Sequence, residues 1–183
     1  MQSRDFVLFA HGAFKGEIEG RTALQKKVFF LSIVLEEDLG YKPHYYGPYS
    51  SFVTEANLEL KELGYISESL NVYGYDSHGF EMKKYSYALT EDGEKLLGRK
   101  MKQFPEEWTK VTNAADTMRA AGRLDYMELA IAAKAYIILR QTGGTSNRNN
   151  IKSQAEKLGW SIDNENLEKA LTYLEKIDLV AWV

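Results

Sequence analysis

LGYISESLNVYGYDSHGFEMKKYSYALTEDG, residues 63–93, is the stretch that decides the fold. Its two runs at 65–75 and 80–89 are rich in tyrosine and aliphatic residues, which favours β-strands. The tetrad DSHG at 76–79, between the two runs, consists of residues that commonly form turns. The stretch therefore predicts a β-hairpin.

The residues that flank this hairpin are typical of helix ends. Gly64 precedes the first run, and glycine tolerates the left-handed conformation that closes many helices. Thr90 follows the second run, and its hydroxyl, together with the acidic Glu91 and Asp92, suits the start of a new helix. We expect a helix on each side of the hairpin.

Three amphipathic patterns precede the hairpin. Apolar residues recur at intervals of three and four from Arg4 to Phe14, from Leu24 to Leu35 and from Ser50 to Leu63. Each pattern predicts a helix with one buried face. The buried face expected for the third helix consists of Phe52, Ala56, Leu60 and Leu63.

The ends of the second helix are predicted from its flanking residues. Thr22 and Gln25 have the spacing of a capping box, in which each side chain satisfies a free backbone amide of the first turn. Gly40 is expected to end this helix. Residues 41–48 contain two prolines, so we expect a short edge strand there rather than a helix.

The second half of the chain is predicted to be helical. Pro105 is expected to open a connecting helix that ends near Ala121, and residues 124–139 are apolar on nearly every side, as in a buried helix. Residues 151–174 then show a second helix-turn-helix pattern, and residues 177–180 predict one final strand.

Together these patterns predict an α+β, mainly helical fold. Residues 1–103 are expected to form a winged helix-turn-helix domain, and residues 104–123 a connecting helix. Residues 124–183 are expected to form a second, degenerate winged-helix-like domain that lacks a complete wing.

Composition narrows the class of protein. The chain has 183 residues, a net charge of −3 and no cysteine, which excludes disulfides, thiolate nucleophiles and cysteine-ligated zinc. The longest strongly apolar stretch, 28–35, is far shorter than a bilayer requires, and the polar first residues are unlike a signal peptide. We expect a cytoplasmic protein that does not bind membranes.

The sequence offers no pattern typical of a catalytic, cofactor or metal site. His11, His44 and His78 are isolated from one another, and none has metal-ligand spacing with another. His11 lies among apolar neighbours and is expected to be a hydrogen-bonded group at the edge of the core. The pair Gly143-Gly144 lacks the lysine and hydroxyl that follow in a phosphate-binding loop. We therefore expect a protein without enzymatic activity.

A DNA-binding role is the first functional hypothesis. In winged-helix proteins the second helix of the turn motif enters the major groove and the wing contacts the backbone. Here that helix is residues 50–63, whose expected outward face includes three glutamates, Glu55, Glu59 and Glu62. Such a face is poorly suited to phosphates. The candidate nucleic-acid-binding residues are Arg21, Lys26, Lys27, Thr54, Asn57, Lys61, Lys83 and Lys84, with His78 at the wing tip.

Protein binding is the alternative. Tyr45, Tyr46 and Tyr49 lie beside Gly47 and Pro48, and exposed aromatic residues in such loops often anchor partners. The same tyrosines also suit a structural corner that packs on the sheet. The acidic helix and the many tyrosines favour an interaction module, antitoxin-like or an accessory subunit, that does not bind DNA. Across the two hypotheses, the expected partners are double-stranded DNA, another protein or a second copy of the chain.

Three segments carry a resemblance to a known family: GRTALQKKVF at 20–29, YGPYS at 46–50, and YALT at 87–90 followed by Gly93. In these segments the N-terminal half resembles the YwgA-like winged-helix proteins and, more distantly, the Panacea domain of SocA-like antitoxin and phage-associated proteins. The resemblance implies a winged-helix fold and a regulatory or antitoxin-like setting. It implies no activity that is tied to particular residues.

Overall fold

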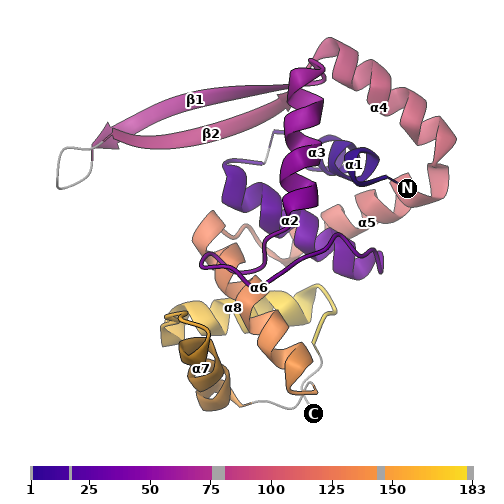
Figure 1. Ribbon diagram of the computed structural model, residues 1–183. Coiled ribbons are helices and arrows are strands. Elements are labelled where there is room, and N and C mark those ends of the chain that lie inside the picture. The colour runs from indigo at the N-terminus through magenta and orange to yellow at the C-terminus, as the bar shows by residue number, and fades with distance from the viewer. Residues whose placement is uncertain (1, 17, 76–80, 144–146, 181–183) are drawn as a thin grey trace.

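A computed structural model describes residues 2–16, 18–75, 81–143 and 147–180 (Figure 1). It is mainly helical with a small antiparallel sheet, which confirms the predicted class. The helices are α1 (Ser3–Ala13), α2 (Arg21–Val34), α3 (Ser51–Glu62), α4 (Glu91–Gln103), α5 (Pro105–Ala121), α6 (Tyr126–Gln141), α7 (Arg148–Lys157) and α8 (Asn164–Lys176). The strands are β1 (Ile66–Tyr75) and β2 (Glu81–Leu89).

The predicted hairpin is confirmed in its two strands. β1 and β2 pair antiparallel, with Ile66 opposite Leu89, and the register shifts between Val72 and Gly74. The pair projects away from the helices (Figure 1). At its base, Ser86 of β2 also forms an antiparallel bridge to Glu19, in the segment between α1 and α2. The predicted turn at 76–79 lies outside the described residues.

Helices α3 and α4 begin as the sequence predicts. The Ser50 side chain accepts a hydrogen bond from the Val53 amide, and the Thr90 side chain accepts one from the Gly93 amide. Both bonds satisfy amide groups of a first turn that have no partner within the helix. The connecting helix α5 also starts at Pro105 and ends before Gly122, as predicted.

Aromatic contacts join the two halves of the chain. The ring of Phe29 on α2 lies 6.0 Å from that of Tyr136 on α6, and Phe30 lies 5.8 Å from Tyr173 on α8. These residues belong to one continuous cluster of buried apolar side chains that includes residues from α1 to α8. The predicted division after residues 103 and 123 stays a prediction, but its parts share this core.

Both predicted ends of α2 are wrong. The helix follows Gly20, and no side chain caps its first turn, because Gln25 binds Ser50 instead of Thr22. It ends at Val34, where Glu36 takes the left-handed conformation (φ 57°) and the Glu37 amide donates to the Ser32 carbonyl. This hydrogen bond closes the helix without glycine.

Gly40, predicted to end α2, is instead required beyond that helix. It has a positive φ of 65°, and a Cβ atom there would lie 2.7 Å from the ring of Phe52. The following segment forms only an isolated bridge between Lys42 and Tyr49 rather than the expected edge strand. The two prolines in this segment remove donors that a longer ladder would need.

The predicted inner face of α3 is partly wrong. Ala56 and Leu60 are buried as expected, but Phe52 and Leu63 are each 53% exposed. Val53 and Asn57 are buried in their place. The helix is therefore rotated relative to the predicted apolar stripe, because its contact with α1 includes a polar group.

The final predicted strand is also wrong. Asp178 has a φ of 58°, and the Leu179 amide donates to the Leu174 carbonyl, so residues 177–180 form a turn that closes α8. The Tyr65 amide donates to the Leu60 carbonyl in the same way after α3. The two segments share a helix ending, but within the described residues only the earlier one leads into a strand.

Among the described residues, no helix combines the length and apolar character that a bilayer span requires.

Candidate functional site

A pocket of about 430 Å³ lies between α2, α3, the loop that joins them and the base of the hairpin. We call it the α2–α3 pocket. It gathers most of the residues that the sequence marks as candidates: Arg21, Lys26, Tyr46, Tyr49, Thr54, Asn57 and Lys61. It thus joins residues from both functional hypotheses in one place.

Two of its cations are neutralised by one carboxylate. Lys61 Nζ lies 2.6 Å from Glu68 Oε1, and Arg21 lies 3.8 Å from Glu68 Oε2. Burial opposes the charged carboxylate, but hydrogen bonds from Lys61 and Tyr87 and the nearby positive charges hold the pKa of Glu68 below its usual value. Burial and this hydrogen bond raise the pKa of Tyr87 to about 12. Arg21 also stacks 4.2 Å above the Tyr85 ring.

A second pair of cations is buried without such a carboxylate. Lys26 is 2% exposed, and its Nζ donates to the Pro48 carbonyl at 2.6 Å. Lys134 of α6 is 9% exposed, and its Nζ lies 5.3 Å from the centre of the Trp160 ring. Burial lowers the pKa of Lys26 to about 7, with a further contribution from the charge of Lys134. Burial also lowers the pKa of Lys134.

The two lysines meet at Gly47. A Cβ atom at Gly47 would lie 3.2 Å from Lys134 Cγ and 3.4 Å from Lys26 Cε. It would also lie 3.2 Å from the carbonyl oxygen of Ala130, and the φ of Gly47 is +83°. Glycine therefore lets the loop enter between α2 and α6, so that both lysine side chains pack against it.

Hydrogen bonds hold this loop in place. The Gln25 side chain donates to the Ser50 carbonyl at 2.9 Å and accepts from the Ser50 amide at 3.0 Å. Trp160 Nε1 donates to the His44 carbonyl at 2.9 Å, which ties the turn after α7 to the loop. The geometry of the pocket thus depends on both halves of the chain.

His11 and Asn57 pair beside the pocket. His11 is 4% exposed, as the sequence predicts for a hydrogen-bonded group at the core, and its Nε2 lies 2.8 Å from Asn57 Oδ1. Burial lowers the pKa of His11 to about 4, although the bond to Asn57 opposes this shift. Asn57 was predicted to contact nucleic acid, which requires an exposed side chain, but it is only 8% exposed because it binds His11.

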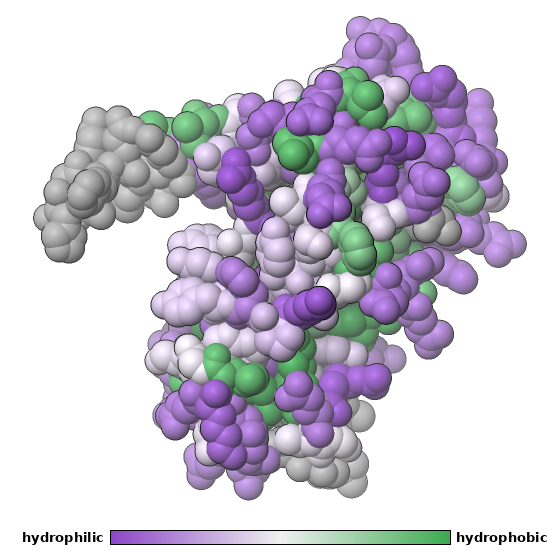
Figure 2. All heavy atoms as spheres, viewed as in Figure 1, coloured by the Kyte–Doolittle hydropathy of each residue, from purple (hydrophilic) through white to green (hydrophobic). Residues whose placement is uncertain are grey.

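A wide groove of about 1140 Å³ adjoins the pocket and shares Arg21, Thr22 and Tyr46 with it. We call it the hairpin groove. It lies between the base of the hairpin, the start of α6 and the turn after α7, and a hollow is visible below the hairpin base in Figure 2. Its exposed apolar side chains are Tyr45 (68% exposed), Tyr46 (47%), Tyr126 (47%) and Met127 (43%).

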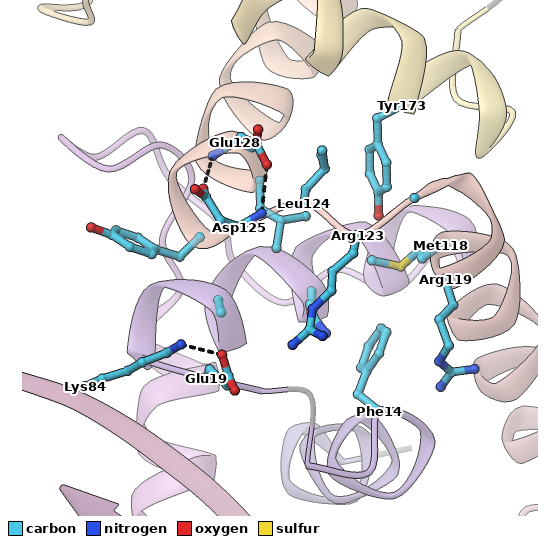
Figure 3. A pocket seen from close by; sticks show the side chains of 15 residues that line it. Phe14, Glu19, Lys84, Met118, Arg119, Arg123, Leu124, Asp125, Glu128 and Tyr173 are labelled. Carbon is cyan, nitrogen blue, oxygen red and sulfur yellow. Dashed lines mark hydrogen bonds and ion pairs between the residues drawn. The ribbon is translucent and has the colours of Figure 1, made fainter. Parts of the chain in front are cut away.

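A further cavity of about 410 Å³ lies between α1, α2, α5, α6 and α8 (Figure 3). Tyr173 and Phe14 both point into it, and the Lys84–Glu19 ion pair lies at one side. The carboxylates of Asp125 and Glu128 also line it, but they cap the first turn of α6. Their carboxylates are thus already engaged in hydrogen bonds with backbone amides of the chain.

The predicted cations are divided between these cavities. Lys27 lines the cavity of Figure 3, where its Nζ lies 4.4 Å from the centre of the Phe14 ring. Lys84 lines that cavity and the hairpin groove, and pairs with Glu19. The side chain of Lys83 and the whole of His78 lie outside the described residues.

Sequence reasoning missed Lys134, Trp160 and Glu68. Lys134 left a signal, because it is the only charged residue in the apolar run LAIAAKAYIIL at 129–139. A lysine in such a run either interrupts the buried face and reaches solvent, or is buried because it has a specific partner. Trp160 left none, since its partner His44 lies 116 residues away. Glu68 left none, since its partners Lys61, Arg21 and Tyr87 lie on three different elements.

In the part of the chain that the structure describes, no three histidine, aspartate or glutamate side chains gather in a manner that would hold a metal ion. No protein-family model matches the chain, and no curated protein sequence matches it significantly.

Proposed function

We propose that the chain is a non-catalytic winged-helix protein that binds another protein through the α2–α3 pocket and the hairpin groove. The winged-helix assignment is supported by the succession of α1, α2, α3 and the hairpin. The bridge between Glu19 and Ser86 supports it too, because it joins the base of the hairpin to the segment between the first two helices.

The observation that carries the proposal is the set of exposed aromatic side chains at a concave surface. Tyr45, Tyr46 and Tyr126 are between 47% and 68% exposed, and all three line the hairpin groove. Tyrosine is enriched in protein interfaces, because it provides a large apolar area and a polar group at a small entropic cost. A partner that covers these rings would remove them from water.

DNA binding is the second candidate, and it draws on the same fold and on the cations around α2. Arg21 and Lys61 already face Glu68, however, and Lys84 already pairs with Glu19. A phosphate would have to compete with these carboxylates, whereas phosphate affinity depends on cations that are free to displace counterions. The exposed Glu55 and Glu62 on α3 would repel phosphates further. We therefore place protein binding first.

The test compares the chain with a variant whose groove lacks its rings. The immobilised chain and its Tyr46→Ser/Tyr126→Ser variant are exposed to extract from the source cells, with and without nuclease. Leu63→Ser is the control, since Leu63 is at least as exposed as the two tyrosines but lies outside the groove. We expect a defined protein that the chain and the control retain after nuclease treatment and that the double variant loses.

Two outcomes would overturn the proposal. Retention of the same proteins by the double variant would show that the groove is not the binding surface. Binding that nuclease abolishes, together with binding to a DNA duplex that weakens steeply as salt rises, would favour the DNA-binding candidate.

A further inference from the structure

The buried lysines stand apart from the other cations of the molecule. In the described part of the chain, neither Lys26 nor Lys134 is paired with a carboxylate. The contacts that they do make are the Pro48 carbonyl and the face of Trp160. Removing an ammonium group from water without a counterion is costly, and a second ammonium group nearby adds to this cost.

The surroundings of Lys26 contain more positive than negative charge. The titratable side chains that line its pocket or face it from α6 are Arg21, His44, Tyr46, Tyr49, Lys61, Glu68, Tyr87 and Lys134. Glu68 is the one carboxylate among them, and it is bound by Lys61 and Arg21. The pocket therefore has a charge that a single anionic group from outside would complement.

The pocket adjoins the proposed docking surface. Tyr46 lines both the α2–α3 pocket and the hairpin groove, so the two hollows adjoin at its ring. Lys26 lines the pocket, and Lys134 lines the groove. Gly47, the residue after Tyr46, is contacted by both lysine side chains, so a side chain inserted beside Tyr46 would lie next to the point where the two lysines approach each other.

We propose that Lys26 and Lys134 bind a carboxylate side chain, a glutamate or aspartate, of the partner protein. This inference rests on the proposed function and adds the chemistry that the partner must present. A carboxylate suits the site better than a phosphate, because a ligand of two buried ammonium groups must lose water and a doubly charged phosphate holds its water more strongly. Nearby tyrosines would pack against the apolar part of the inserted side chain.

The occupied site has a characteristic pH dependence. An anion stabilises the protonated form of Lys26, so binding raises its pKa above about 7 and takes up a proton. Affinity should therefore be highest below pH 7 and fall as the pH rises and Lys26 loses its charge. If only the ammonium form binds, affinity should be about tenfold weaker at pH 8 than at pH 6.

The proposal is tested on the intact chain with lysine side chains labelled at Cε, whose signals are recorded by NMR. The probe is a blocked tetrapeptide that contains one tyrosine and one glutamate, and its matched control contains glutamine instead. We expect the glutamate peptide alone to shift the Cε signals of Lys26 and Lys134 saturably, more tightly at pH 6 than at pH 8. The Cε signal of Lys152, on the exposed face of α7 beside Asn164, should not move.

Variants check that the lysines act together. Lys26→Met should abolish the response of Lys134, and Lys134→Met that of Lys26, while Lys152→Met leaves both responses unchanged. Three results would overturn the proposal. They are equal shifts with the two peptides, no shift in the unaltered chain, and shifts with inorganic phosphate but not with the glutamate peptide. The measurement on the unaltered chain decides even if a methionine variant fails to fold.

The partner-capture assay separates this inference from the proposed function. If the Tyr46→Ser/Tyr126→Ser variant loses the partner while Lys26→Met/Lys134→Met retains it with unchanged affinity, the groove binds a protein but the lysines do not hold its carboxylate. Loss of the partner in both variants, with no loss in Lys152→Met, is the result expected here.

Discussion

At the scale of single residues, the buried polar side chains matter most for the position of the helices, because each has few hydrogen-bond partners. The Gln25 amide binds both the carbonyl and the amide of Ser50, and the Ser50 residue is fully buried. The Gln25 side chain thereby fixes the start of α3 against α2, and with it one wall of the α2–α3 pocket. His11 and Asn57 form a comparable pair between α1 and α3.

Gln25→Leu should therefore destabilise the chain by about 2 kcal/mol, because the buried Ser50 amide loses its partner and the Ser50 carbonyl keeps only its longer bonds from Thr54. The free energy of unfolding from urea titrations measures the effect. Gln103→Leu serves as the control, since Gln103 is exposed at the end of α4. An equal, small change in both variants would show that the Gln25 bonds do not support the fold.

The buried His11 should make stability depend on acidity. Its pKa is about 4 in the folded chain and about 6.5 when unfolded, so the unfolded chain takes up a proton first as the pH falls. The stabilisation is complete above pH 6.5 and lost progressively as the pH falls towards 4, by on the order of 3 kcal/mol. In urea titrations across this range, His11→Gln should flatten the decline, whereas His44→Gln, at an exposed position, should retain it.

At the scale of elements, the junction between the hairpin and α4 is unusually close. The carbonyl of Tyr65, at the entry to β1, accepts a hydrogen bond from the Thr90 amide just after β2. A Cβ atom at Gly93 would lie 1.9 Å from that same carbonyl oxygen. Glycine at this position therefore lets the first turn of α4 pack directly on the backbone where the hairpin begins.

Two glycines of α4 provide a matched pair of substitutions. Gly93→Ala should destabilise the chain by about 2 kcal/mol or more, because the backbone must move to admit the methyl group. Gly98→Ala should instead stabilise it by about 0.5 to 1 kcal/mol, because no atom lies within 4 Å of its Cβ position and alanine favours the helix. Thermal unfolding compares the two, and similar shifts in Tm would contradict the close packing at this junction.

Sequence patterns predicted these elements well where the signal was local. Thr90 caps α4 as predicted, because its hydroxyl and the Gly93 amide lie three residues apart. The predicted cap at Thr22 was wrong because Gln25 has a better partner 25 residues away. Distant competition of this kind leaves no trace in the spacing of neighbouring residues.

At the scale of the whole molecule, α2 is the element that both halves share. It contacts α1, α3 and α5, and it lies against α6 with the Gly47 loop beside it. The predicted hairpin and helices follow from local patterns, but this assembly does not. The convergence of Lys26 and Lys134 depends on it, which explains why the sequence indicated the cations around α2 but not their arrangement.

The shared core should make the chain unfold as one unit. Because α2 and α6 bury the same cluster of apolar side chains, neither can open without exposing the other. In hydrogen exchange, the slowest amides of both helices should therefore report the same free energy of opening. A lower value for α6 than for α2 would show that the C-terminal part unfolds separately, as a division into independent domains requires.

The two-stranded sheet also bears on how the protein behaves when concentrated. Beyond the bridge at Ser86, neither β1 nor β2 has another strand beside it in the described residues, and Leu70 and Val72 are each about half exposed. Exposed strand edges of this kind favour pairing between molecules. The register shift between Val72 and Gly74 disrupts the regular row of backbone donors and acceptors there. It therefore opposes the growth of fibrils and aggregates.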